Sequence, residues 1–131
     1  MRVLIDSTVW IDFFHGDSAP HTDRLRELIS KGEDLCLCGH VLAEVLRGTR
    51  QDAQYRKIER HFAVLEFLPM RQSTFKAAAD IYRQLRRKGI TLKNSVDTFI
   101  AAVALEHDVF LLHNDSDFDL IAEEYPLRGS E

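Results

Sequence analysis

The sequence predicts an α/β fold with a mostly parallel central sheet. Short continuous apolar runs, typical of buried parallel strands, alternate along the chain with segments whose apolar residues recur at helical spacing. Strands and helices that alternate in this way form a parallel sheet covered by helices. The length of 131 residues suits one domain with a substantial core, so we expect a single domain over residues 1–131.

Four apolar runs are the expected strands. The first begins almost at the amino terminus and ends at Asp6. Gly39 interrupts the second run and Pro69 stops the third, because neither residue favours the interior of a strand. The expected strands cover residues 3–5, 35–38, 64–68 and 109–112.

The segments that follow these runs are the expected helices. Ser7 or Thr8 is the expected N-cap of the first helix, because a side-chain hydroxyl can accept a hydrogen bond from a free N–H of the first turn. The longest helix is expected to end at Gly89, since glycine readily adopts the left-handed conformation found there. The expected helices cover residues 9–14, 21–31, 41–47, 51–61, 73–88, 96–104 and 117–123.

The composition is that of an ordinary soluble globular protein. Hydrophobic residues make up 45% and charged residues 29%, and the formal net charge of -4 argues against a polycation that binds nucleic acid over its whole surface. No apolar run approaches the ~18 residues of a membrane-spanning helix, and no secretory signal is visible, so we expect a cytoplasmic protein without a membrane segment. Cys36 and Cys38 are expected to be reduced core residues, because their i, i+2 spacing suits a disulfide poorly.

Four acidic residues each interrupt or end an apolar run. Asp6 closes the first strand, and Glu44 lies within an apolar helical segment. Asp97 directly precedes another such segment, and Asp115 follows the last strand. A carboxylate beside a buried segment costs several kcal/mol unless it is paired or binds a metal. Four of them indicate one shared site, and like charges share a site only when a cation lies among them.

The expected positions of these acids suit one end of the sheet. In open parallel sheets, ligands bind outside the carboxyl ends of the strands, where we expect Asp6 and Asp115. Helices that follow a strand or loop can begin at the same end, which suits Glu44 and Asp97. Oxygen ligands without cysteine or histidine favour Mg²⁺ or Mn²⁺ over zinc. Such an ion activates water for attack on phosphorus, so the predicted reaction is phosphodiester hydrolysis.

Four segments together resemble the PIN-domain ribonucleases, and in particular the VapC-type toxins of bacterial toxin–antitoxin pairs. Each segment holds one of the acids, and the segments follow the order and spacing of that family over the whole length. The resemblance implies a PIN-like three-layer α/β/α sandwich with a short, mostly parallel central sheet. It also implies a Mg²⁺- or Mn²⁺-dependent endoribonuclease. The matching segments are residues 3–11, 41–48, 96–102 and 112–118.

By this resemblance, Asp6, Glu44 and Asp97 are the first three acids of the catalytic metal site. Asp115 matches the usual fourth position best. Asp117, two residues further on, is a supporting acid or a substitute for Asp115 in that position.

Polar neighbours are expected to support the site. Ser7 and Thr8 are expected to orient the Asp6 carboxylate by hydrogen bonds. His113 stands where the family usually has a threonine, and we expect no catalytic role for it. The other histidines form no ligand set and are expected on the solvated surface; they include His21, His40, His61 and His107.

Basic residues near the acids are the expected RNA contacts, namely Arg47, Arg86, Arg87 and Lys93. The backbone of single-stranded or looped RNA can be splayed into a pocket, which favours such RNA as the substrate. The same basic residues also fit an ordinary solvated helix face, because cations are favourable near a helix C-terminus.

The resemblance also implies two protein partners. The antitoxin of VapC-type toxins covers an apolar groove and often places an arginine among the acids, and PIN domains of this type commonly pair as homodimers. Trp10, Phe13 and Phe14 lie on the first expected helix. They are expected to pack in the core or to form part of that groove.

The sequence therefore predicts a metal-dependent endoribonuclease, the toxin of a type II VapBC-like pair, which hydrolyses RNA with a metal-activated water. The alternative is a non-catalytic RNA-binding or regulatory PIN-like module, which loss of the acids would favour. A phosphoryl-receiver domain also needs a lysine at a later strand end, and none stands out here. Taken singly, Asp6 also suits a helix cap, Glu44 an ion pair with Arg47, and Asp97 a first helical turn.

Overall fold

Four parallel strands form the centre of the computed structural model, which describes residues 1–129. The strand order is β3-β2-β1-β4, and every neighbouring pair is parallel, so the predicted α/β class with a parallel sheet is confirmed. The strands are β1 (Arg2–Ile5), β2 (Asp34–Cys38), β3 (Glu66–Leu68) and β4 (Phe110–Leu112).

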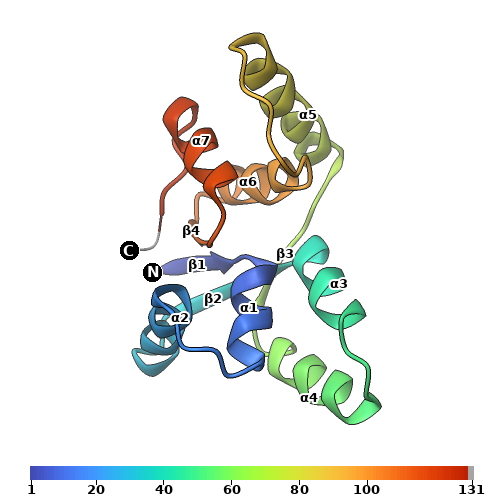
Figure 1. The fold of residues 1–131 in the computed structure, drawn as a ribbon. Helices are drawn as coiled ribbons and strands as arrows, with labels where there is room; N and C mark the ends of the chain where they lie inside the picture. Colours follow the sequence, from blue (N-terminus) through green and yellow to red (C-terminus); the bar gives the residue numbers. More distant parts are fainter. Residues whose placement is uncertain (130–131) are drawn as a thin grey trace.

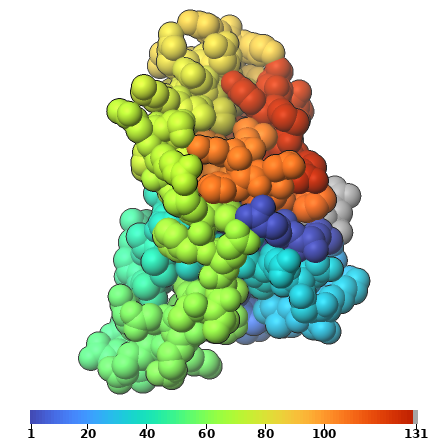
Figure 2. Space-filling model, turned by 180° about the vertical axis from the view of Figure 1, so that it is seen from behind, coloured from blue at the N-terminus to red at the C-terminus, as the bar shows by residue number. Residues whose placement is uncertain are grey.

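Seven helices of the described residues lie on the two faces of this sheet (Figure 1). One layer contains α1 (Ser7–Phe14), α2 (Pro20–Ser30), α3 (Gly39–Arg47) and α4 (Asp52–Phe62). The other contains α5 (Gln72–Arg87), α6 (Asp97–Glu106) and α7 (Ser116–Glu124). From behind, the chain between α4 and α5 runs from one layer to the other (Figure 2). Within residues 1–129, no helix has both the length and the apolar character needed to span a membrane.

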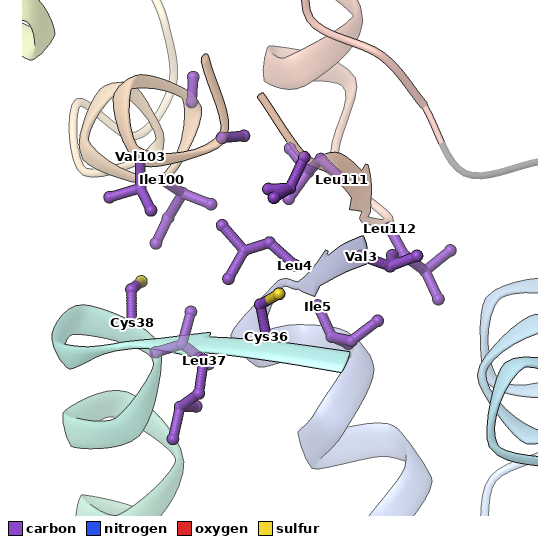
Figure 3. Close-up of a cluster of buried hydrophobic side chains, with 14 of the residues drawn as sticks. Val3, Leu4, Ile5, Cys36, Leu37, Cys38, Ile100, Val103, Leu111 and Leu112 are labelled. Carbon is purple, nitrogen blue, oxygen red and sulfur yellow. The ribbon is translucent and has the colours of Figure 1, made fainter. Parts of the chain in front are cut away.

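The core lies where the strands meet the helices on both faces. Val3, Leu4 and Ile5 of β1 have no exposed surface, as expected of a central parallel strand with a helical layer on either side. Figure 3 shows side chains of α6, among them Ile100, pointing toward the strands. Cys36 is buried in β2, and burial raises the pKa of its thiol to about 11, so it is a packing residue rather than a reactive one.

Most boundaries differ from the sequence-based prediction by one or two residues, and two of these differences have a clear structural reason. The third strand begins at Glu66 rather than at Val64, whose surface is 84% exposed, because the chain leaves α4 through a turn in which the Leu65 N–H donates to Phe62. The first helix begins at Ser7 itself, and Asp6 occupies its N-cap position without making the side-chain cap. An apolar run does not reveal whether its first residues face water or a sheet neighbour.

The topology brings four segments to the carboxyl end of the sheet. The Asp6 N–H donates to the carbonyl oxygen of Leu112 at 2.9 Å, which continues the pairing of β1 with β4 beyond both strands. Helix α3 starts immediately after β2, and α7 starts after the short loop that follows β4. The ends of β1 and β4 and the starts of α3 and α7 therefore gather around Asp6.

Gly89 ends α5 in the left-handed conformation, as predicted, with φ of 81°. Its N–H donates to Arg86, and the next N–H, of Ile90, donates to Leu85. Gly48 follows α3 with φ of -81°, a conformation that any residue adopts readily. The backbone conformation at position 89 therefore requires glycine, whereas the conformation at position 48 does not.

We expect Gly89→Ala to destabilise the protein and Gly48→Ala to leave its stability nearly unchanged. A Cβ at Gly89 would meet no other atom, so the expected loss of roughly 1–2 kcal/mol comes from backbone conformation alone. Urea unfolding of the two variants and the wild type would measure the difference. Equal midpoints for the two alanine variants would contradict it.

Candidate metal and catalytic site

Three aspartates converge where α6 and α7 begin. Asp97 is the first residue of α6, Asp115 is the N-cap of α7, and Asp117 lies in the first turn of α7. One carboxylate oxygen from each lies within 4.8 Å of the others. Residues that are 20 positions apart in the sequence thus form one group of ligand-type oxygens.

Asp6 lies beside this group and connects it to Glu44. Burial raises the pKa of the Asp6 carboxyl, a hydrogen bond from Thr8 opposes that rise, and the negative charge of Glu44 adds to it. The Ser7 hydroxyl donates to Oε1 of Glu44 at 3.1 Å. Asp6 and Ser7 are almost fully buried, whereas the Glu44 side chain is 21% exposed, so Glu44 forms the solvent side of the site.

The crowding of carboxylates has a large effect on the pKa of Asp97. Burial and the charges of Asp115, Asp6 and Asp117, in that order, raise the pKa of Asp97 to about 8. Its Oδ2 atom is buried and has no hydrogen-bond partner among the described residues. A buried oxygen without a partner, surrounded by other carboxylates, is the environment in which a bound cation removes an unfavourable interaction.

These residues fit a divalent cation bound through oxygen. Asp97 and Asp115, together with Asp117 or the neighbouring Asp6, would hold it. The clustered group contains no cysteine or histidine, the ligands that favour zinc. A bound Mg²⁺ or Mn²⁺ supplies activation of water and charge neutralisation at a phosphate.

Asp117 makes contacts that distinguish it from Asp115. Its side chain is 1% exposed, and its two oxygens accept the backbone N–H groups of Lys93 at 3.3 Å and Asn94 at 2.9 Å. Asp115 accepts the N–H of Asp117, at 2.9 Å, and remains partly exposed. Asp117 thus fastens the loop that leads into Asp97, while Asp115 keeps an oxygen available.

The hydroxyl contacts differ in part from the prediction. The Thr8 hydroxyl donates to Oδ2 of Asp6 at 2.9 Å, as expected. The Ser7 hydroxyl does not orient Asp6 as predicted, because it points across to α3 and donates to Glu44 instead. Neighbours in sequence at a helix start point in different directions, which the sequence pattern alone does not reveal.

The four histidines that were expected on the solvated surface, His21, His40, His61 and His107, are all partly buried. His40 Nε2 lies 3.2 Å from Oε1 of Glu44, and the ring packs against Phe99. His21 pairs with Asp12 at 2.7 Å, and His61 packs against Trp10. The i, i+4 spacing of His40 and Glu44 on one helix was the available sequence signal for the first of these contacts.

His113 replaces the usual threonine by holding the backbone of the same loop. Its Nδ1 accepts the N–H of Asp115 at 3.3 Å, and its ring packs against Phe118. His113 also lies close enough to Asp6 for its charge to lower the pKa of that carboxyl. It supports the loop that carries Asp115 without joining the three clustered aspartates.

The basic residues divide into two groups. Arg47 lies 3.8 Å from Glu44, and Lys93 lies 3.7 Å from Asp115, so both flank the acids. Arg86 and Arg87 are exposed at the C-terminal end of α5, where the guanidinium of Arg86 lies over the Tyr82 ring at 5.7 Å. The structure brings only the first pair to the acids.

The chain belongs to the PIN domain family, whose model matches residues 3–124. It is 34% identical over 130 residues to a VapC ribonuclease of Mycobacterium bovis and equally to ribonuclease VapC11 of Mycobacterium tuberculosis, with 98% of this chain and 97% of each relative covered. PIN-domain nucleases generally depend on divalent metal ions, and the clustered aspartates agree with that property.

Solved structures show the same fold. A chain of the VapBC2 complex from Rickettsia felis has a TM-score of 0.76 at 18% identity, covering 99% of this chain and 98% of that one. A chain of VapBC-1 from nontypeable Haemophilus influenzae has a TM-score of 0.76 at 20% identity, covering 100% and 98%. The Mycobacterium tuberculosis VapC20 structure, whose toxin cleaves the sarcin–ricin loop, gives 0.65 at 16% identity, covering 94% and 95%.

We expect the metal-free protein to lose stability as the pH rises. The Asp97 carboxyl has a pKa of about 8 in the folded chain against an ordinary value of 3.8, so the folded state holds this proton more tightly. Stability therefore falls between these two pH values and levels off above the higher one. Asp97→Asn should remove most of this dependence and be more stable than the wild type at pH ~8 by roughly 1 kcal/mol or more.

Urea unfolding in chelator across this pH range would measure that dependence. Added Mn²⁺ should then stabilise the wild type at the alkaline end but not Asp97→Asn. A wild-type profile as flat as that of the variant would contradict the expectation.

Asp115 and Asp117 should respond differently to the same substitution. Asp117→Asn turns an NH₂ group toward one backbone N–H, so we expect a stability loss of about 1–3 kcal/mol. Asp115→Asn keeps a good helix N-cap and should mainly weaken Mn²⁺ binding, by roughly tenfold or more. Denaturant unfolding and calorimetric Mn²⁺ titration would separate the two effects, and equal losses in both would count against the assignment.

Proposed function

We propose that this chain is a Mg²⁺- or Mn²⁺-dependent endoribonuclease and the toxin of a type II toxin–antitoxin pair. Its relatives at 34% identity are named as VapC ribonucleases, and its fold matches toxins from toxin–antitoxin complexes. The single observation that carries the proposal is the buried Asp97 oxygen without a partner, which lies among Asp6, Asp115 and Asp117. The sequence 1–131 is proposed to act as one domain, in the cytoplasm.

We assign the catalytic and metal-binding roles to Asp6, Glu44, Asp97 and Asp115. Asp97 and Asp115 present their oxygens to one point, and Asp6 approaches them from the end of β1. Glu44 faces solvent, where the RNA backbone would approach; the Ser7 hydroxyl donates to its Oε1 atom, and His40 Nε2 lies 3.2 Å from that atom. This placement suits Glu44 to position the attacking water. Asp117 acts as the supporting acid, because it fixes the loop before Asp97.

The proposed substrate is single-stranded or looped RNA that lies across the acids. Arg47 and Lys93 flank the carboxylates from opposite sides, on α3 and before α6, and their side chains are 76% and 70% exposed. Both cations can therefore reach phosphates on either side of the scissile bond. Arg86 and Arg87 would contact only a longer RNA that extends along α5.

The proposed antitoxin-binding surface is a groove distant from the carboxyl ends of the strands, lined by apolar side chains and by the carboxylates of Glu33, Asp34 and Glu66. Ile29 and Val64 are exposed beside a cavity of about 520 Å³ between the ends of α2 and α4, which His61 also lines. Trp10 is fully buried, while Phe13 and Phe14 are only partly buried next to His61. An amphipathic segment of an antitoxin could bury these side chains.

A homodimer is proposed on separate grounds. Phe67 of the edge strand and Phe75 of α5 are 52% and 48% exposed, and Phe75 packs against Phe99 near the start of α6. Exposed aromatic side chains that continue a core cluster are typical of a surface covered by a second copy.

We expect Asp6→Asn and Asp97→Asn each to lower the rate of RNA cleavage by about 100-fold or more, because removing a charge that organises the transition state costs about two powers of ten. Purified, antitoxin-free protein would be assayed on structured RNA with Mg²⁺ or Mn²⁺, and then with chelator. Asp80→Asn is a matched control, because Asp80 is exposed on α5 and pairs only with Arg83.

Cleavage that needs the metal and disappears in both variants, but not in the control, would support the endoribonuclease. Equal cleavage by all variants would indicate a contaminating nuclease. RNA binding without any cleavage would favour the alternative, a non-catalytic RNA-binding module.

A further inference from the structure

A pocket of about 500 Å³, lined by polar and charged residues together with Pro20 and Leu112, lies next to the acids, between α2 and the segment that follows β4. His21 and Arg24 of α2 form one wall, and Leu112, His113 and Asn114 form the other. The Leu112 carbonyl accepts the N–H of Asp6, so the second wall is hydrogen-bonded directly to the end of β1. The volume is within the usual range for a small-molecule site.

The charges of this pocket are balanced by partners within the protein. Arg24 lies 3.1 Å from Glu27, Asp23 lies 3.2 Å from Arg26, and His21 lies 2.7 Å from Asp12. A phosphate would require an excess of positive charge, which these pairs do not leave. A planar, uncharged, polar ring suits the pocket better.

Arg24 retains hydrogen-bonding capacity inside the pocket. Its side chain is 17% exposed, and Glu27, its ionic partner among residues 1–129, contacts a single nitrogen of the guanidinium. The Asn114 side chain is exposed beside it and has both donor and acceptor groups. A guanidinium fork matches the O6 and N7 atoms of guanine, and a carboxylate such as that of Glu27 accepts from the Watson–Crick N–H groups of the same base.

We propose that the pocket between α2 and residues 112–114 binds an unstacked guanine of the RNA through Arg24. This guanine lies on one side of the scissile phosphate. This inference rests on the proposed endoribonuclease function and adds a specificity-determining residue to it. Arg47 and Lys93 then position the RNA backbone, and Arg24 selects the sequence.

The test measures base preference rather than activity alone. Hairpin RNAs with randomised loops would be cleaved in Mn²⁺, and sequencing of the cut ends would give the base frequencies around the cut. We expect guanine at one fixed position in the wild-type products. Arg24→Gln should reduce kcat/KM on guanine-containing loops about tenfold and on other loops less than about twofold.

Two further variants separate recognition from folding. Arg24→Lys keeps the positive charge but loses the planar fork, so it should also lose the guanine preference. Arg60→Gln removes an exposed arginine of α4 outside the pocket, so this variant should retain the guanine preference. Circular dichroism melting curves would confirm that all variants fold. A guanine preference that survives in Arg24→Gln, or a wild type without base preference, would overturn the proposal.

A binding measurement distinguishes failure of the pocket from failure of the nuclease. Guanosine and adenosine would be titrated in chelator while the ring C–H signals of His21 are followed by NMR. We expect shifts with guanosine only, and none in Arg24→Gln. If the wild type cleaves no RNA, these shifts decide the proposal by themselves. If Arg24→Gln instead weakens only inhibition by the antitoxin, the pocket binds the antitoxin rather than a base of the RNA, and the proposal is overturned.

Discussion

The structure depends on how a cluster of carboxylates is accommodated at the end of a buried sheet. Asp6, Asp97 and Asp117 are each no more than 6% exposed, so water cannot screen their repulsion. Protonation of Asp97 is one solution, and the pKa of about 8 reflects it. A divalent cation is the other, and it keeps every carboxylate ionised. The fold retains an arrangement that is unfavourable without a ligand, which is how a site for a cation remains preformed.

The short parallel sheet makes this arrangement possible with few residues. Parallel strands place all their carboxyl ends at one side, so Asp6 at the end of β1 and the loop after β4 become neighbours. Asp117 then fastens the start of α6 to the start of α7 through two backbone N–H groups. One buried aspartate therefore fixes the position of Asp97, although it belongs to a different element.

The sequence predicted those features that depend on residues close together in the chain. Strands appeared as short apolar runs, and the acids stood out because each interrupts such a run. The sequence was insufficient where a contact depends on side-chain direction across elements: the Ser7 hydroxyl reaches Glu44, and His40 lies against the same carboxylate. The predicted start of the third strand at Val64 was wrong for a related reason, because an exposed apolar residue in a turn cannot be told from a strand residue by its type. Periodicity reports burial patterns within an element and carries no information on its partners.

The charge distribution is compatible with the proposed RNA substrate, although the protein is acidic overall. The two flanking cations already pair with the acids, Arg47 with Glu44 and Lys93 with Asp115. A divalent ion that neutralises the carboxylates weakens their attraction for these side chains, which are more than two-thirds exposed and free to turn toward phosphates. The local charge at the site thus becomes much less negative when the ion binds. The formal net charge of -4 describes the whole chain, whereas the proposed RNA substrate would respond to the few charges within a Debye length, ~8 Å, of the scissile bond.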